Sequence, residues 1–318
     1  MKYKFLLVFL AVLLIMPMKA NAYFPGQHVY IAEVPLATCT TTICNEIKQY
    51  PAVFEAGIQF TDASVFRYVT SLKDYQDTHS FETTYIRCLK AAGEYTDLKV
   101  FCYGMIAHDT ADINPHNIYV PKKIKEYKIP IFSSNVFLHP IIELNLDKRT
   151  PDEYRFKASH ALDIIYQPSS AGYTYLEFTH KFLPAGLNLD KEVGLLQTAL
   201  GNGNFNLWDA SSSGGSDIQG KIIRSIWKFV DATSGIFIDT SDADQYIEAS
   251  MRDLQRFYNG EVQTNLDPAG TVALKLADTK ADLVKLVFTI IIILFVLVML
   301  IRYLIKHRAG VVKIIRKK

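Results

Sequence analysis

The chain has 318 residues, of which 49% are hydrophobic and 12% aromatic, and these fractions exclude an intrinsically disordered protein. Its formal net charge of +2 conceals an asymmetry, because residues 1–22 and 302–318 contain basic side chains and no acidic ones. The intervening residues 23–301 hold 24 basic and 32 acidic residues, a net charge of −8. This acidic middle argues against a general nucleic-acid binder, which needs a basic face.

The N-terminus has the pattern of a secretory signal peptide. Two lysines precede a 12-residue apolar run, which is followed by Ala20-Asn21-Ala22. An uncleaved membrane anchor is the alternative, but the apolar run is short for a membrane span. We therefore expect residues 1–22 to be a signal peptide and Tyr23 to be the first residue of the mature protein.

A second apolar segment lies near the C-terminus. Residues 286–301 contain no charged side chain, and 283–305 is long enough to cross a hydrocarbon core of roughly 30 Å. A buried core helix is the alternative, but apolar side chains on every face of the segment favour a transmembrane helix. The basic tail 306–318 should lie in the cytoplasm. These patterns predict a single-pass membrane protein whose residues 23–280 face outward.

Four cysteines lie in the outward-facing segment: Cys39, Cys44, Cys88 and Cys102. An even number of cysteines in an oxidising compartment predicts two disulfides. Cys39–Cys44 would close a short loop, and Cys88–Cys102 would join two consecutive helices, although four cysteines allow three pairings. A zinc cluster is the rival interpretation, but the spacings are not C-x-x-C.

The outward-facing segment has the apolar periodicity of an all-α domain. Helices are predicted, in chain order, over 28–36, 45–60, 81–93, 97–113, 133–148, 151–166, 187–200, 220–232 and 241–259. Gly93 is a typical helix stop, and Pro151 suits the first position of a helix. The composition of 201–220 indicates a loop, and 261–280 is a polar connection to the membrane helix.

Histidines and carboxylates recur at helical spacing between residues 28 and 143. His108, Asp112 and His116 stand at i, i+4 and i+8, which predicts one face of a helix carrying two imidazoles and a carboxylate. His139 and Glu143 repeat the i, i+4 spacing. Any one such pair more often stabilises a helix or lies on a solvated face. Asp112, however, stands in an apolar stretch, where a carboxylate needs a partner.

The order of these residues resembles the zinc-dependent phospholipase C family and, more distantly, the fungal single-strand nucleases of the same helical fold. The resemblance covers residues 23–147, and its most specific part is His108-x-x-x-Asp112-x-x-x-His116-Asn117. The family's order of ligands is met by these residues: His28, Asp62, His79, His108, Asp112, His116, His139 and Glu143. His160 and His180 lack such a context and are expected to be ordinary structural residues, and His307 is part of the basic tail.

The resemblance implies two or three zinc ions held between helices. The first zinc would be held by Asp62, His79, His108 and Asp112. The second zinc would be held by His116, His139 and Glu143. Asp112 would bridge to a third zinc, held also by His28 and by the free amine and carbonyl of Tyr23, where the family usually has Trp.

The resemblance implies the activity of a membrane-anchored phosphodiesterase that hydrolyses phospholipid head groups, with Asp62 accepting a proton from the attacking water as well as binding zinc. Histidine and carboxylate ligands with open positions suit catalytic rather than structural zinc. A membrane-tethered zinc nuclease or 3'-nucleotidase is the first alternative, although the net charge of −8 argues against a polynucleotide partner. A non-catalytic metal-binding ectodomain is the second alternative.

Overall fold

The computed structural model describes residues 25–62, 78–127, 142–143, 145–183, 239–261 and 267–268. Within these ranges all regular structure is helical, and the only β-type pairing there is an isolated bridge between Pro168 and Thr174. The predicted all-α class is therefore confirmed for the described part of the chain.

Three helices open the described chain: α2 (Pro25–Thr38), α3 (Thr42–Gln49) and α4 (Pro51–Thr61). The sequence predicted one helix over 45–60, and this was wrong because the segment is divided at Tyr50. Pro51 has no N–H to donate to the preceding turn, so it ends α3 and occupies the first position of α4.

The next predicted helix, 81–93, is present in two parts. A π-helical segment, η2 (Glu82–Arg87), leads into α6 (Cys88–Ala92). The predicted stop at Gly93 is confirmed, because this residue adopts a φ of 57° that side chains with a Cβ avoid.

The longest described helix is α7 (Thr96–Asn114), which passes into the π-helical η3 (Pro115–Tyr119) and then into α8 (Val120–Glu126). The sequence placed His116 on one α-helical face with the two ligands before it. His116 instead lies in the π-helical turn, because Pro115 cannot donate the backbone hydrogen bond that would continue the α-helix.

Four further elements follow: α10 (Asp152–Ala161), the 3-10 helix η4 (Leu162–Tyr166), α11 (Tyr175–Thr179) and α14 (Asp244–Tyr258). Pro151 precedes α10 rather than occupying its first position. The sequence did not predict α11, although Thr174 and Glu177 form a capping box at its start.

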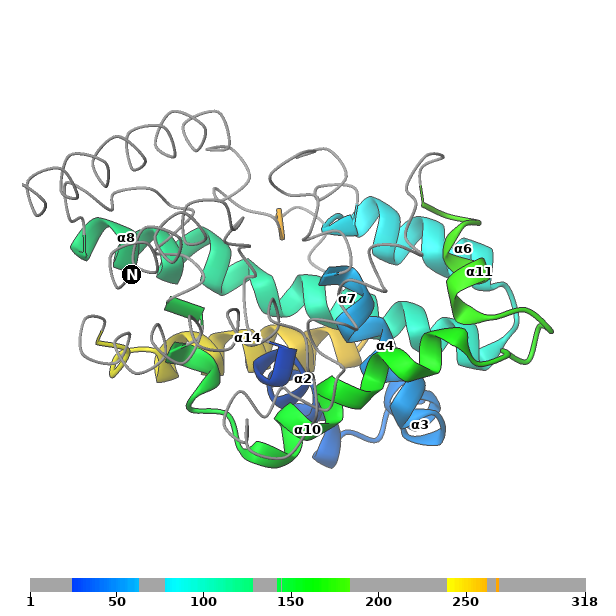
Figure 1. Cartoon of the computed structure of the whole chain (residues 1–318), viewed down its shortest axis with the longest axis horizontal. Coiled ribbons are helices and arrows are strands. Elements are labelled where there is room, and N and C mark those ends of the chain that lie inside the picture. Colours follow the sequence, from blue (N-terminus) through cyan, green and yellow to red (C-terminus); the bar gives the residue numbers. More distant parts are fainter. Residues whose placement is uncertain are drawn as a thin grey trace, which may run out of the picture.

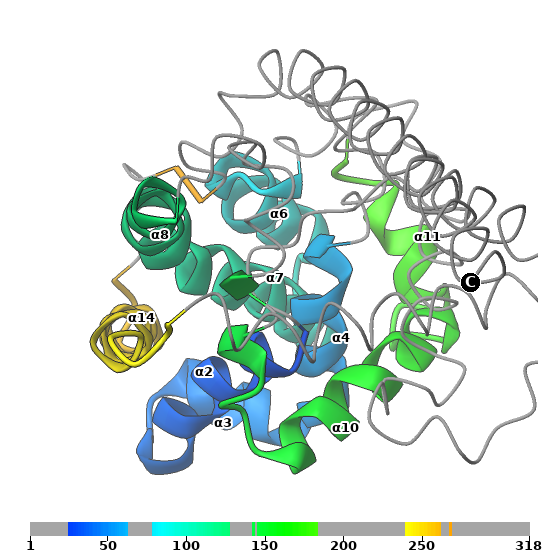
Figure 2. The same ribbon diagram turned by 60° about the vertical axis from the view of Figure 1, so that its left-hand side comes forward.

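The described helices surround α7, which packs against α2, α4, α6 and α14 (Figures 1 and 2). The contact between α4 and α7 is close because Gly57 and Gly104 face each other at the crossing. A Cβ at Gly104 would lie 2.8 Å from the backbone nitrogen of Ile58, nearer than side chains tolerate. Two glycines thus let α4, which Asp62 follows directly, pack closely on the helix that carries His108.

Both predicted cysteine pairs are at disulfide geometry. The Cα atoms of Cys39 and Cys44 are 5.9 Å apart, and those of Cys88 and Cys102 are 5.7 Å apart. The second bridge joins α6 to α7, as the sequence predicted.

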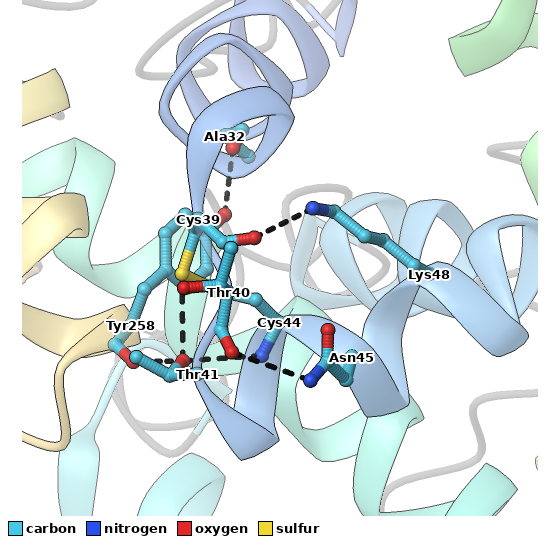
Figure 3. The surroundings of a disulfide bond; sticks show 8 residues. All are labelled: Ala32, Cys39, Thr40, Thr41, Cys44, Asn45, Lys48 and Tyr258. Carbon is cyan, nitrogen blue, oxygen red and sulfur yellow. Dashed lines mark hydrogen bonds between the residues drawn. A yellow bond between two sulfur atoms is a disulfide. The ribbon is translucent and has the colours of Figure 1, made fainter.

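Around the first bridge, the last residue of α14 packs against α2 and against the chain between α2 and α3 (Figure 3). The Tyr258 hydroxyl donates a hydrogen bond to the Ala32 carbonyl at 2.6 Å, and the Tyr258 carbonyl accepts one from the Thr41 hydroxyl at 2.7 Å. Residues more than 200 positions apart in sequence are thereby held together.

No helix among the described residues combines the length and the apolar composition that a membrane span requires. The predicted span 283–305 lies outside the described residues. The same is true of the signal peptide 1–22, the helices 187–200 and 220–232, the loop 201–220, the tail 306–318, and most of 133–148 and 261–280.

Candidate metal centre

Six segments bring histidines and carboxylates to one buried place. One of these side chains comes from α2, one from the C-terminal end of α4, one from the residues before η2, two from α7, one from η3 and one from residues 142–143. At most 1% of the surface of each of these residues is exposed: His28, Asp62, His79, His108, Asp112, His116 and Glu143. We refer to these seven residues as the buried cluster.

Asp112 lies at the centre of the buried cluster. Its Oδ1 is 2.9 Å from His28 Nε2, and its Oδ2 is 3.3 Å from His108 Nε2. The same Oδ2 is 3.8 Å from His116 Nδ1 and 3.9 Å from His79 Nε2. One carboxylate on α7 therefore lies within 4 Å of four imidazoles.

Asp62 forms a second focus with two of the same histidines. Its Oδ1 is 3.6 Å from His79 Nε2 and 3.7 Å from His108 Nε2. The imidazoles of His28 and His108 are stacked, with centroids 3.9 Å apart and planes 10° from parallel. His108 therefore belongs to both groups, because its Nε2 lies within 4 Å of both Asp62 and Asp112.

A third group lies beside η3. His116 Nε2 is 3.9 Å from Glu143 Oε1, and both side chains are fully buried. On the other edge of its ring, His116 Nδ1 is 2.7 Å from the backbone carbonyl oxygen of Pro268. The predicted partner of this pair, His139, lies outside the described residues, as does Tyr23.

Burial and the neighbouring charges shift the pKa values of the cluster in opposite directions. Although burial opposes it, the surrounding histidines, with His116 first, hold the pKa of Asp112 well below its usual value. Burial lowers the pKa of His28 and of His116. Burial, reinforced by Asp112 and Asp62, raises the pKa of Glu143 well above its usual value. Burial therefore favours the neutral form of His28 and His116, which is the form of an imidazole that binds metals.

The buried cluster fits a metal ion by its geometry. Two groups have ligand atoms within 4.8 Å of one another, namely His28 with His108 and Asp112, and Asp62 with His79 and His108. Four-coordinate zinc with ligands at about 2.1 Å separates neighbouring ligand atoms by about 3.4 Å. The histidine–carboxylate atom pairs of the cluster are 2.9–3.9 Å apart, which brackets this value.

Buried polar atoms that make no hydrogen bond also indicate that the buried cluster fits a metal ion. Within the described chain, both carboxylate oxygens of Asp62, Asp112 Oδ2 and His108 Nε2 make no hydrogen bond. Burying such groups without a partner costs several kcal/mol, and a coordinated cation offsets that cost. The buried His and Asp side chains can therefore hold a metal ion.

The two histidines that were predicted to be ordinary structural residues lie outside the buried cluster. His160 and His180 are exposed, and His160 lies near the exposed Asp163 of its own segment, with Nδ1 3.7 Å from Oδ2. Neither belongs to the buried cluster.

Two features of the site were missed from the sequence. Asp109 is fully buried next to His108 and accepts a 2.6 Å hydrogen bond from the Thr84 hydroxyl, which ties η2 to α7. Its place in the same apolar stretch as Asp112 is a signal that could have revealed it. The Pro268 carbonyl could not have been found, because a backbone acceptor has no side-chain signature.

The arrangement brings three carboxylates and four imidazoles together in a region closed to solvent. Such a mixed set of nitrogen and oxygen donors is typical of sites that bind divalent transition metals. No family model, curated protein or solved structure matches the chain.

Proposed function

We propose that the protein is a zinc-dependent phosphodiesterase of the phospholipase C type, which hydrolyses phospholipid head groups. The observation that supports it most is the position of Asp112, whose two oxygens lie within 4 Å of four buried imidazoles. A carboxylate shared in this way is suited to bridging two metal ions. The order of the ligands along the chain resembles that of the zinc-dependent phospholipases C.

The residues of the buried cluster divide into zinc sites as the resemblance implies. Asp62, His79 and His108 would hold one zinc together with Asp112. His116 and Glu143 would hold a second zinc, with His139 as the proposed third side chain. His28 and the mature N-terminus at Tyr23 would complete a third site beside Asp112.

When bound, the zinc ions would supply a water activated for attack near neutral pH and would neutralise charge on the phosphoryl oxygens. Asp62 is the proposed proton acceptor. Although burial opposes it, His108 and the other nearby histidines lower the pKa of Asp62, so its carboxylate is ionised and can take a proton at an oxygen. The buried walls of α4 and α7 exclude bulk water from these groups, which strengthens their interactions with a charged substrate.

The disulfides support the proposed extracytoplasmic location. Stable disulfides form in oxidising compartments, and both cysteine pairs of the chain are at bridging geometry. An outward-facing domain held by a C-terminal membrane helix would act on lipid head groups close to its own anchor.

The test is a pair of hydrolysis assays on the full chain produced through a secretory route. We expect the zinc-loaded protein to hydrolyse a chromogenic phosphocholine ester and to release head groups from phosphatidylcholine vesicles. Chelated protein should be inactive and should recover on addition of zinc. Cleavage of single-stranded DNA with no action on either lipid substrate would instead establish the nuclease alternative. Zinc binding without any hydrolysis would leave a non-catalytic metal-binding ectodomain.

A further inference from the structure

Two backbone carbonyls from the chain beyond α14 lie against the turn that carries His116. His116 Nδ1 is 2.7 Å from the carbonyl oxygen of Pro268, and the Asn117 side-chain amide donates a 2.9 Å hydrogen bond to the carbonyl of Asp267. Neighbouring residues of η3 thus bind neighbouring residues of a segment 150 positions later. Pro268 is buried in this contact, whereas Asp267 is exposed.

The contact determines which nitrogen of His116 carries the proton. A carbonyl oxygen can only accept a hydrogen bond, so Nδ1 must be the donor. A neutral imidazole that is protonated on Nδ1 presents its lone pair on Nε2. Nε2 is the nitrogen on the Glu143 side of the ring, 3.9 Å from Oε1.

Asp112 does not compete for this proton. Its Oδ2 is 3.8 Å from His116 Nδ1, beyond the length of a hydrogen bond, whereas the Pro268 carbonyl is 2.7 Å away. Of these two oxygens, the Pro268 carbonyl is therefore the one that accepts the Nδ1 proton of His116.

We propose that the Asp267-Pro268 backbone is a positioning element of the metal centre, which fixes His116 in the tautomer and orientation that offer Nε2 as a ligand beside Glu143. The proposal rests on the metal-binding part of the proposed function and not on the phosphodiesterase chemistry. Ligand histidines commonly donate their second N–H to a carbonyl or carboxylate, and loss of that partner weakens metal binding by about 10- to 100-fold.

The consequence is that the metal centre depends on chain that follows the last described helix. Residues 267–268 stand between α14 and the segment 283–305 that is predicted to cross the membrane. The connection is therefore part of the site and more than a spacer. A domain boundary drawn directly after α14 would remove a group that orients a ligand.

The sharpest test replaces the residue after Pro268 by its ester analogue. Lactic acid in place of Ala269, introduced into the full chain by nonsense suppression and purified in detergent, turns the Pro268 carbonyl into an ester carbonyl, a weaker acceptor of nearly the same shape. We expect the zinc held by His116 and Glu143 to bind about 10- to 100-fold more weakly in a chelator competition, with the remaining zinc unaffected. The visible absorption of the cobalt-substituted protein should change as well. The same ester at Ala171, in the turn before α11, is the control and should leave both measurements unchanged.

A second variant reaches the same segment through a side chain. Asn117→Asp keeps the shape of the side chain but sets a carboxylate oxygen against the Asp267 carbonyl, which should push the segment away from His116. The matched control is Asn45→Asp, because Asn45 also donates its amide to a backbone carbonyl, that of Thr40, outside the buried cluster (Figure 3). Asn117→Asp should weaken the same zinc as the ester, and Asn45→Asp should weaken neither.

The outcomes separate this inference from the proposed function. Unmodified chain that binds no zinc would overturn the proposed function and this inference together. Unmodified chain that binds zinc, with both variants unchanged in affinity and in cobalt spectrum, would overturn this inference alone. An equal loss of zinc affinity in the variants and in their controls would also overturn it, since the loss would then not depend on the contact with His116.

Discussion

At the residue scale, Asp112 is the central residue of the buried cluster, because its carboxylate lies within 4 Å of four imidazoles. It lies on the buried face of α7 among apolar neighbours, and its carboxylate lies near the imidazoles of His28 and His108. The sequence predicted this residue because a carboxylate in an apolar helix needs a partner. What the sequence could not supply was the distance to His28, which depends on how α2 packs against α7.

Asp112→Asn tests the role of this carboxylate. The amide removes the negative charge and replaces one ligand oxygen by an NH2 group, which cannot coordinate a metal. We expect the variant to lose at least one zinc per chain and to lose hydrolytic activity by 100-fold or more, at about 10–100-fold for each weakened ligand. Metal analysis and the phosphocholine ester assay measure the two effects. His160→Ala and His180→Ala are the matched controls, since both side chains are exposed, and each should remain within a few-fold of the unmodified protein.

A second residue-scale prediction concerns Asp147. This buried residue packs against the first turn of α2, where it accepts a 3.1 Å hydrogen bond from the Gln27 backbone N–H. Burial raises its pKa from 3.8 to about 7, while the charge of Arg155 and the Gln27 N–H act in the opposite direction. Between these values the folded chain keeps a proton that the unfolded chain has released. The free energy of unfolding must therefore fall as the pH rises from about 4 to about 7.

Asp147→Asn cannot ionise and should remove this pH dependence while keeping the acceptor for Gln27. We expect the free energy of unfolding of the variant, relative to that of the unmodified protein, to be roughly 2.7 kcal/mol higher at pH 8 than at pH 5, at about 1.4 kcal/mol per pH unit below the folded pKa of about 7. Urea unfolding of both proteins at the two pH values measures the difference, and any effect of zinc cancels in the comparison. An equal difference between the two proteins at pH 5 and pH 8 would show that Asp147 does not titrate in this range.

At the scale of elements, the sequence predicted helices far better than it predicted their interruptions. The helices before Gly93 and Gly260 end where glycine allows a positive φ, which is a local property of the chain. The π-helical segment η2 has no proline or glycine to mark it, whereas η3 begins at Pro115, a signal that the prediction did not use. His116 was therefore predicted as a ligand but placed on the wrong kind of turn.

Gly104→Ala tests whether the crossing of α4 and α7 sets the geometry of the site. An added methyl group would collide with the α4 backbone at Gly57 and Ile58, so the helices must separate. We expect a loss of about 1–3 kcal/mol in stability from overpacking, together with weaker zinc binding, because Asp62 and His108 lie on the two separated helices. Thermal unfolding and chelator competition measure the two effects.

Gly93→Ala is the control for this substitution. A Cβ at Gly93 would meet no atom within 4 Å, but the residue has a φ of 57°, so the cost is backbone strain alone. Its stability should fall by about 1–3 kcal/mol, with zinc affinity unchanged. If Gly104→Ala also left zinc affinity unchanged, the crossing would serve packing only.

At the scale of the whole molecule, the buried cluster joins segments that are distant in the chain. A ligand set drawn from α2, α4, α7, η3 and residue 143 means that a bound metal cross-links the fold. Metal binding then adds to the free energy of unfolding by linkage. Zinc at 100 times its dissociation constant contributes about 2.7 kcal/mol per site.

Chelation should therefore lower the melting temperature by roughly 5–10 °C for each site, given about 2–4 °C per kcal/mol for a domain of this size. Differential scanning calorimetry before and after exhaustive chelation measures the shift, and added zinc should reverse it. Asp112→Asn provides the reference, because its melting curve should respond less to the chelator.

A further prediction concerns the N-terminus. If Tyr23 is the first residue of the mature chain, its amine can bind zinc only after the signal peptide has been removed. One residue added before Tyr23 moves the amine by about 3.8 Å, whereas metal–ligand distances tolerate about 0.2 Å. The extended protein should lose about one zinc per chain, and mass spectrometry of the intact protein can verify both the start of the chain and the metal count. Full zinc content in the extended protein would exclude the amine as a ligand.

The most direct test of the central claim is the zinc content of the full chain, purified from a secretory host and measured by atomic emission spectroscopy beside Asp112→Asn. A metal-dependent phosphodiesterase with this buried cluster should carry two or three zinc ions per chain, and the variant should carry at least one fewer. Less than one zinc per chain in the unmodified protein, after equilibration with excess zinc and removal of unbound metal, would contradict it.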